Sequence, residues 1–238
     1  GAAEYEQSPR VEKLRAAMTA LAQFHIATSD FEPSAITIRG PKVDALRHTP
    51  SAIQRRLAQL REFSQRGADE LTGTPTDTIW PELAPLARQF LAAFPIAAQN
   101  AIAKLEPLTD VRLPLQPCLR DVWHDHILFT GDEVTGVIDF GAVDIDTPAT
   151  DIARLLGSLV ADDSEGWRTG LAAYSRVRPL SPDESVATSA LDKCGTVLVG
   201  CNWIRWIYID RRTFENRPQV IDRFRRILTR VSLSPPKT

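Results

Sequence analysis

Apolar residues recur every three or four positions in the first part of the chain, a spacing that is typical of amphipathic helices. Ser8 and Pro9 fit the N-cap and the first position of a helix whose apolar face continues to His25. The segment from residue 30 to residue 50 is rich in turn-forming residues instead. The pattern therefore predicts one long helix followed by an irregular stretch.

Two further helices are predicted before residue 110. Apolar residues at helical spacing cover residues 53–63, and this run closes near Gly67. The next run begins at Pro81, and Pro95 is expected to kink it or to divide it in two, because proline removes a hydrogen bond from a helix interior. The first hundred residues are therefore predicted to be mostly helical.

The pattern changes to that of short strands after residue 111. Two β-rich runs, residues 126–130 and 133–140, are separated only by Gly131 and Asp132. Glycine adopts positive φ without steric cost, and this suits a tight turn between antiparallel strands. We expect a β-hairpin within a segment of about residues 111–147.

Helical periodicity returns after this hairpin. Thr147 with Pro148, and Ser181 with Pro182, repeat the cap-and-proline signal of a helix start. The very apolar run at residues 197–209 is predicted to be a central core helix, and residues 217–231 a last helix before a proline-containing tail that should fray. The chain is predicted to be an α+β protein that is mainly helical.

Composition narrows the possible classes of protein. The 238 residues are 43% hydrophobic and 24% charged, with a net charge of −2, which is typical of a globular protein and lacks the excess of cations that binding to nucleic acid requires. Cys118, Cys194 and Cys201 have neither disulfide nor zinc spacing and are expected to be buried thiols in a reducing compartment. No apolar run is long enough to span a membrane and no signal peptide is visible, so we expect a cytoplasmic protein without a membrane partner.

Candidate chemistry is concentrated around the predicted hairpin. Asp121 precedes the first strand by a loop, His126 stands at the entrance of that strand, and Asp139 leaves the second strand. A hairpin brings its two ends together, so His126 and Asp139 should face one small volume with Asp121 at its rim. A carboxylate that accepts a hydroxyl proton, beside groups that hold a divalent cation, is what phosphoryl transfer from a nucleotide needs.

These residues resemble the catalytic core of the aminoglycoside phosphotransferase and choline kinase type enzymes, whose pattern runs HxDxxxxN and then DFG or DWG. Asp121 falls on the catalytic aspartate, His126 on the asparagine, and Asp139, Phe140 and Gly141 on the triplet. The resemblance implies a protein-kinase-like C-terminal lobe covering residues 1–238 as a single catalytic and substrate-binding lobe. It also implies ATP and Mg²⁺ as cofactors, Asp139 and His126 as metal ligands, and Phe140 and Gly141 as the cofactor-binding loop.

Three neighbouring positions bear on how the loop is supported. Residues 146–159 resemble the start of the family's DPxxDLA helix, which makes Asp151 the buried aspartate that anchors the catalytic loop. Leu119 replaces the histidine of the family pattern and leaves Arg120 beside Asp121 as a kinase-like pair, so Arg120 is expected to be a supporting residue. His126 in place of asparagine is a softer ligand that suits Mn²⁺ or Zn²⁺ better than Mg²⁺.

The nucleotide-binding features of the family's N-terminal β lobe are not visible. The sequence has no GxGxxG motif and begins with Gly1 instead of methionine. None of its lysines stands in a strand context; they are Lys13, Lys42, Lys104, Lys193 and Lys237. We expect the chain to be the C-terminal lobe of a longer enzyme, with an upstream lobe as its partner, and to be inactive or weakly active alone.

Two other classes of function stay open. One is a kinase-like binding module that has lost phosphoryl transfer. The other is a metal-dependent hydrolase, because His124 and His126 would share one face if both lay on a strand. The sequence specifies neither the small-molecule acceptor nor the oligomeric state.

Overall fold

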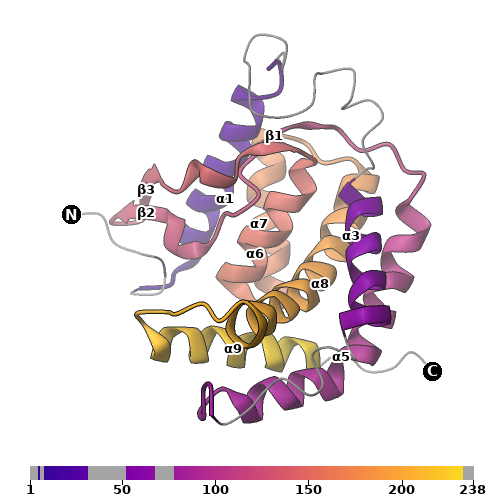
Figure 1. The fold of residues 1–238 in the computed structure, drawn as a ribbon. Coiled ribbons are helices and arrows are strands. Elements are labelled where there is room, and N and C mark those ends of the chain that lie inside the picture. The colour runs from indigo at the N-terminus through magenta and orange to yellow at the C-terminus, as the bar shows by residue number, and fades with distance from the viewer. Residues whose placement is uncertain (1–4, 6–7, 32–51, 68–77, 233–238) are drawn as a thin grey trace. The chain divides into compact units, whose positions relative to one another are not determined.

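The computed structural model describes residues 5, 8–31, 52–67 and 78–232 and divides into two compact units. One unit comprises residues Gly1–Ala52 and Val111–Asp192, and the other Ile53–Asp110 and Lys193–Thr238. Helices predominate, accompanied by two small antiparallel strand pairs (Figure 1). The predicted α+β, mainly helical class is confirmed, whereas the single lobe over residues 1–238 stays a prediction.

Three helices form the framework of the first unit: α1 (Val11–Ala27), α6 (Pro148–Val160) and α7 (Ser164–Val177). Helix α1 packs against both of the others, and its apolar stripe supplies the buried side chains that the periodicity predicted. The core they share is hydrophobic and fully enclosed; it includes Met18, Phe129, Ile152, Leu156 and Tyr174. Burial of such side chains stabilises each by roughly 1.5–3 kcal/mol relative to exposure.

Gly170 on α7 packs against the side chain of Leu156 on α6. A Cβ atom at this position would lie 2.4 Å from Cδ2 of Leu156, so a larger residue here would force the end of that side chain to move.

Two strand pairs lie in the first unit. The predicted hairpin is confirmed, with β2 (Ile127–Thr130) antiparallel to β3 (Glu133–Val137) and a register irregularity at Leu128/Phe129. Gly131 in its turn has φ 63°, as the turn requires. A second pair joins β1 (Gln116–Cys118) to β4 (Asp144–Asp146) and was not predicted.

The second unit contains α3 (Ala52–Glu62), a π-helical turn (Phe63–Gly67), α5 (Ala84–Leu105) and α9 (Arg217–Ser232). It also takes in the later part of α8 (Pro182–Ile204), which a second π-helical turn (Arg205–Ile209) extends. Helix α5 packs against α9, where Phe90 and Phe224 meet edge to face with 5.8 Å between ring centroids. Helix α5 is continuous through Pro95; of the two outcomes predicted for this proline, a kink or a division into two helices, the division is wrong.

The proline signals for helix starts had mixed outcomes. Helix α6 begins as predicted, with Thr147 as N-cap and Pro148 as the first residue. Helix α8 also begins at its proline, and Ser181 and Glu184 exchange side-chain-to-backbone hydrogen bonds as a capping box. Helix α1 begins two residues later than predicted, with Arg10 as N-cap.

Two predicted features lie outside the described residues: most of the turn-rich stretch at 30–50 and the C-terminal tail. A membrane-spanning helix needs about 18 or more apolar residues in succession. None of the helices in the described part of the chain meets that requirement.

Candidate active site

The hairpin brings its two ends together. A short 3₁₀ helix, His124–His126, leads into β2, and Asp139 follows the end of β3. The backbone N–H of Ile138 donates to the carbonyl oxygen of His126 over 3.0 Å, so the ladder continues to the last residue before Asp139. This local pairing fixes the separation of the two ends.

The imidazole of His126 lies between Asp121 and Asp139. Its Nδ1 is 2.8 Å from the carbonyl oxygen of Asp121, and its Nε2 is 3.7 Å from Oδ2 of Asp139. A carbonyl oxygen only accepts, so Nδ1 carries the hydrogen, and in the neutral ring the lone pair of Nε2 faces the carboxylate. The three residues that the sequence singled out are therefore neighbours in space.

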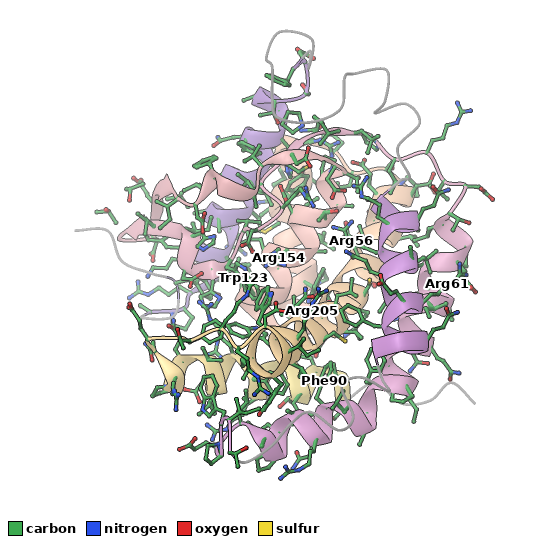
Figure 2. All side chains as sticks on the ribbon, in the orientation of Figure 1. Arg56, Arg61, Phe90, Trp123, Arg154 and Arg205 are labelled. Carbon is green, nitrogen blue, oxygen red and sulfur yellow. The ribbon has the colours of Figure 1, made fainter. Side chains whose placement is uncertain are left out.

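The carboxylate of Asp121 is held from two directions. The indole Nε1 of Trp123 donates to its Oδ1 over 2.7 Å, and Nη2 of Arg154 forms an ion pair with the same oxygen. The guanidinium of Arg154 also stacks on the ring of Trp123, 4.3 Å from its centroid (Figure 2). Since the side chain of Asp121 is 43% exposed, these contacts orient a carboxylate that solutes can reach.

Asp139 sits on a strained stretch of backbone. Its φ of 65° and ψ of 65° are left-handed, a region that non-glycine residues rarely adopt and that is concentrated at functional sites. Phe140 and Gly141 follow in a 3₁₀ turn, Phe140–Ala142, and the ring of Phe140 is half exposed. The carboxylate of Asp139 is also exposed and is directed toward the same space as Nε2 of His126.

The backbone before Asp121 is fixed from inside the protein. Asp151 accepts hydrogen bonds from the backbone N–H groups of Leu119 (2.6 Å) and Arg120 (2.7 Å) and is completely buried. Arg120 has φ 61°, and its guanidinium pairs with Asp144 at 2.7 Å. This is the arrangement that a loop-anchoring aspartate requires.

Comparison with known proteins assigns this architecture to a family. The family model described as APH, phosphotransferase enzyme family, matches residues 2–185. The chain belongs to this phosphotransferase family. Its fold is similar to those of solved structures: a choline kinase, LicA, from Streptococcus pneumoniae covers 98% of this chain with a TM-score of 0.53 and 14% identity, and the chain covers 68% of it. An aminoglycoside phosphotransferase from Alicyclobacillus acidocaldarius has a TM-score of 0.51 and 22% identity, over 94% of this chain and 63% of that one.

The sequence relatives are homoserine kinases. One from Janthinobacterium sp. is 29% identical over 136 residues, which are 55% of this chain and 40% of that protein. Another from Agrobacterium fabrum is 26% identical over 195 residues, 79% of this chain and 50% of that protein. The chain thus spans about half the length of the curated relatives it matches.

The structure contradicts the strand geometry on which the metal-dependent hydrolase hypothesis depends. His124 and His126 belong to a 3₁₀ helix and not to a strand. Side chains two residues apart in such a helix point about 120° apart around the axis, so the shared strand face on which the hydrolase hypothesis rested does not exist. His124 is buried, whereas His126 reaches the site.

Several residues around the site, among them Trp123, were not assigned to it from the sequence. Arg154 lies one turn after Asp151 on α6, on nearly the same face, and that spacing was a usable signal. Asp125 places a carboxylate oxygen 3.8 Å from Nε2 of His126. His25 donates from α1 to Asp151, and no local motif links residues that far apart in sequence.

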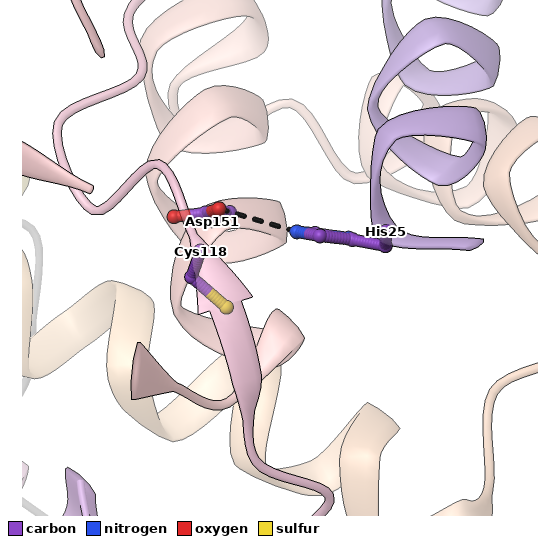
Figure 3. A group of neighbouring side chains, drawn as sticks. All are labelled: His25, Cys118 and Asp151. Atoms are coloured by element: carbon purple, nitrogen blue, oxygen red, sulfur yellow. Dashed lines mark hydrogen bonds and ion pairs between the residues drawn. The ribbon is translucent and has the colours of Figure 1, made fainter. Parts of the chain in front are cut away.

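His25, Cys118 and Asp151 also form a compact buried group (Figure 3). Among the described residues they are the only three whose potential ligand atoms all lie within 4.8 Å of one another. Burial raises the pKa of the Cys118 thiol far above its usual range, and its Sγ lies 3.3 Å from the carbonyl oxygen of Asp146. The carboxylate of Asp151 in this group already accepts hydrogen bonds from His25 and from the backbone N–H groups of Leu119 and Arg120.

Proposed function

We propose that this protein is an ATP-dependent phosphotransferase that acts on a hydroxyl group of a small molecule. The observation that carries the proposal is the position of His126, whose two ring nitrogens face the backbone of Asp121 and the carboxylate of Asp139. One imidazole thereby links a candidate base to a candidate metal ligand. Membership in the phosphotransferase family and the similarity to homoserine kinases support the same reaction class.

Asp121 is the residue we assign as the general base. Among the described residues, the side-chain contacts of Asp121 are with Trp123 and Arg154, and both fall on Oδ1. We therefore assign the acceptor hydroxyl to Oδ2, on a carboxylate whose orientation is already fixed. A positioned general base contributes typically about 10²- to 10⁴-fold to a rate.

Asp139 and His126 are the residues we assign to a divalent cation bound with ATP. Their donor set fits such an ion, because the hydrogen on Nδ1 of His126 leaves Nε2 to coordinate beside a carboxylate oxygen. Mg²⁺ is usually held by one or two carboxylates together with substrate phosphates, and an imidazole nitrogen shifts the preference toward Mn²⁺. When bound, the ion neutralises charge on the β- and γ-phosphates.

The neighbouring residues support this assignment. Phe140 and Gly141 form the loop that we expect to face the nucleotide. A Cβ atom at position 141 would lie 3.5 Å from Oδ1 of Asp139, so glycine leaves this side of the carboxylate uncovered. We further propose that an upstream lobe supplies the phosphate grip, and that residues 1–238 alone transfer phosphate weakly or not at all.

The experiment measures phosphoryl transfer from ATP by the purified full-length protein, with Mg²⁺ or Mn²⁺. Homoserine is the first acceptor to test because the sequence relatives carry that activity in their names; choline and aminoglycosides follow. We expect Asp121→Asn and Asp139→Asn each to reduce kcat about 10²-fold or more. Asp132→Asn is the matched control, since Asp132 lies on the same hairpin and pairs only weakly with Arg10 at 3.5 Å.

Other outcomes discriminate the alternatives. Nucleotide binding without transfer to any acceptor would identify a kinase-like binding module. When activity is compared between Mg²⁺ and Mn²⁺, His126→Asn replaces an imidazole nitrogen with an amide oxygen and is expected to move the preference from Mn²⁺ toward Mg²⁺. Transfer that is unaffected by both Asp121→Asn and Asp139→Asn would remove these residues from the mechanism.

A further inference from the structure

A network of buried polar side chains lies behind the loop that carries Asp121. His25 on α1, Asp151 on α6 and Tyr174 on α7 are all fully buried. His25 points directly at Asp151 (Figure 3). We propose that His25 and Tyr174 are positioning residues, which fix Asp151 and through it the orientation of Asp121. The proposal rests on the function proposed above.

Asp151 is the point where the network meets the loop. Its Oδ1 accepts from the N–H of Arg120, and its Oδ2 accepts from the N–H of Leu119 and from Nε2 of His25 at 3.2 Å. Hydrogen bonds to a carboxylate are about twice as strong as neutral ones. Because Arg120 has the unfavourable φ of 61°, these bonds hold the backbone next to Asp121 in a conformation that it would otherwise leave.

His25 determines how the carboxylate of Asp151 is turned. Its Nε2 faces a carboxylate oxygen and therefore carries a hydrogen, while its Nδ1 lies 2.7 Å from the hydroxyl of Tyr174. Burial raises the pKa of Tyr174, so the hydroxyl stays protonated and donates a hydrogen bond to Nδ1 of His25. Each bond in this series fixes the direction of the next.

The network is also tied to the rest of the first unit. Arg178 lies near Tyr174 and forms a buried ion pair with Glu184 at 2.8 Å, in the capping box of α8. The side chain of Gln116 donates to the backbone carbonyl of His25 over 2.6 Å and so holds the end of α1 to β1. His25 is therefore restrained through both its ring and its backbone.

The test compares two substitutions of His25 in the full-length protein. His25→Gln can place an N–H donor near the position of Nε2, whereas His25→Leu fills the space without a donor. In His25→Leu we expect the amide exchange of Leu119 and Arg120 to rise about tenfold, as expected for the loss of one buried hydrogen bond. We expect kcat to fall by about tenfold or more while the KM for ATP stays within about twofold, and His25→Gln to recover most of both effects.

Leu14→Ala is the control for a general loss of stability. Leu14 is buried in the core on the same helix, about 16 Å from His25 along the helix axis. This variant should melt at a lower temperature without changing kcat or the exchange of Leu119 and Arg120 below that temperature. Tyr174→Phe removes only one hydroxyl and provides the milder measurement if His25→Leu does not fold.

Each outcome supports or overturns the proposal. If His25→Gln is no better than His25→Leu, or if Leu14→Ala raises exchange at Leu119 and Arg120 equally, the role is general stability and the proposal is wrong. Equimolar zinc in the purified protein that is lost in Cys118→Ala would overturn it as well. Without any phosphotransferase activity the proposed function fails, but the exchange measurement still decides whether the network holds the loop.

Discussion

The two sides of the Asp121 loop are built on different principles. On the outer side, Asp121, Arg154 and Asp139 are charged groups that water reaches. On the inner side, His25, Asp151 and Tyr174 are fully enclosed and hydrogen-bonded to one another and to the loop backbone. Reacting groups need access to substrates, whereas the backbone that aims them needs a fixed frame. The structure assigns these two requirements to opposite faces of one short segment.

The difference is energetic as well as geometric. An ion pair at an accessible site gains little, because water replaces either partner when the other is removed. Water cannot replace a buried acceptor. When such an acceptor is removed, its donors stay buried without a partner, and the protein loses the free energy of desolvating them. Substitutions on the inner side should therefore change stability far more than substitutions on the outer side.

The largest effect is expected for Asp151→Ala. Three donors would lose their acceptor in a site from which water is excluded, and we expect the free energy of unfolding to fall by about 3–5 kcal/mol. Asp151→Asn keeps one acceptor oxygen and should lose less. Urea denaturation of both variants measures these losses.

Asp144→Ala is the matched outer-side control for this prediction. Asp144 also accepts a 2.7 Å hydrogen bond from residue 120, but from the exposed guanidinium instead of the buried N–H. Its loss should cost less than about 1 kcal/mol. Equal losses in Asp144→Ala and Asp151→Ala would contradict the distinction between the two sides.

Much of the outer side could be predicted from the sequence because its geometry is local. Fewer than twenty residues separate Asp121 from Asp139, and one hairpin with a glycine turn places Asp139 beside His126, whose ring also contacts the backbone of Asp121. The predicted hairpin is confirmed, and the roles assigned to these residues stay predictions. Asp151 was found through its resemblance to a family pattern, and it accepts hydrogen bonds from the backbone N–H groups of Leu119 and Arg120.

The inner side could not be predicted in the same way. His25 reads as one more member of the apolar face of α1, and nothing in its neighbours shows that Asp151, 126 residues away, is its partner. The pairing of β1 with β4 was missed because each strand has only three residues. The start of α1 was misplaced because Ser8 and Pro9 satisfy the local signal of a helix start, yet the N-cap is Arg10. Tertiary packing determines these features, and local sequence does not contain it.

A smaller effect on stability is expected for Arg154→Met on the outer side. The substitution removes the guanidinium from both Asp121 and Trp123, and we expect a loss of about 1 kcal/mol or less in urea denaturation. The change in kcat should be larger than this small loss of stability suggests, since Asp121 would keep only its hydrogen bond from Trp123. Arg154→Lys is the comparison, because it keeps the charge without the planar stacking group. A loss as large as that of Asp151→Ala would show that the outer side is structural too.

An effect of similar size is expected at Arg120, which takes part in both sides. Its backbone N–H binds Asp151 on the inner side, while its guanidinium pairs with Asp144 on the outer side. At φ 61° a side chain costs roughly 1–2 kcal/mol relative to glycine. Arg120→Ala loses the ion pair and keeps this strain, whereas Arg120→Gly loses the ion pair and relieves the strain.

We therefore expect Arg120→Gly to be more stable than Arg120→Ala by about 1 kcal/mol in urea denaturation, after the greater unfolded-state entropy of glycine is allowed for. The difference between these two variants measures the backbone strain alone, since both lack the guanidinium. The difference between Arg120→Ala and the unsubstituted protein measures the ion pairs of the guanidinium, with exposed Asp144 at 2.7 Å and with buried Asp146 at 3.8 Å. If Arg120→Ala proves at least as stable as Arg120→Gly, the backbone before Asp121 is not strained, and the bonds from Asp151 are then not needed to hold it.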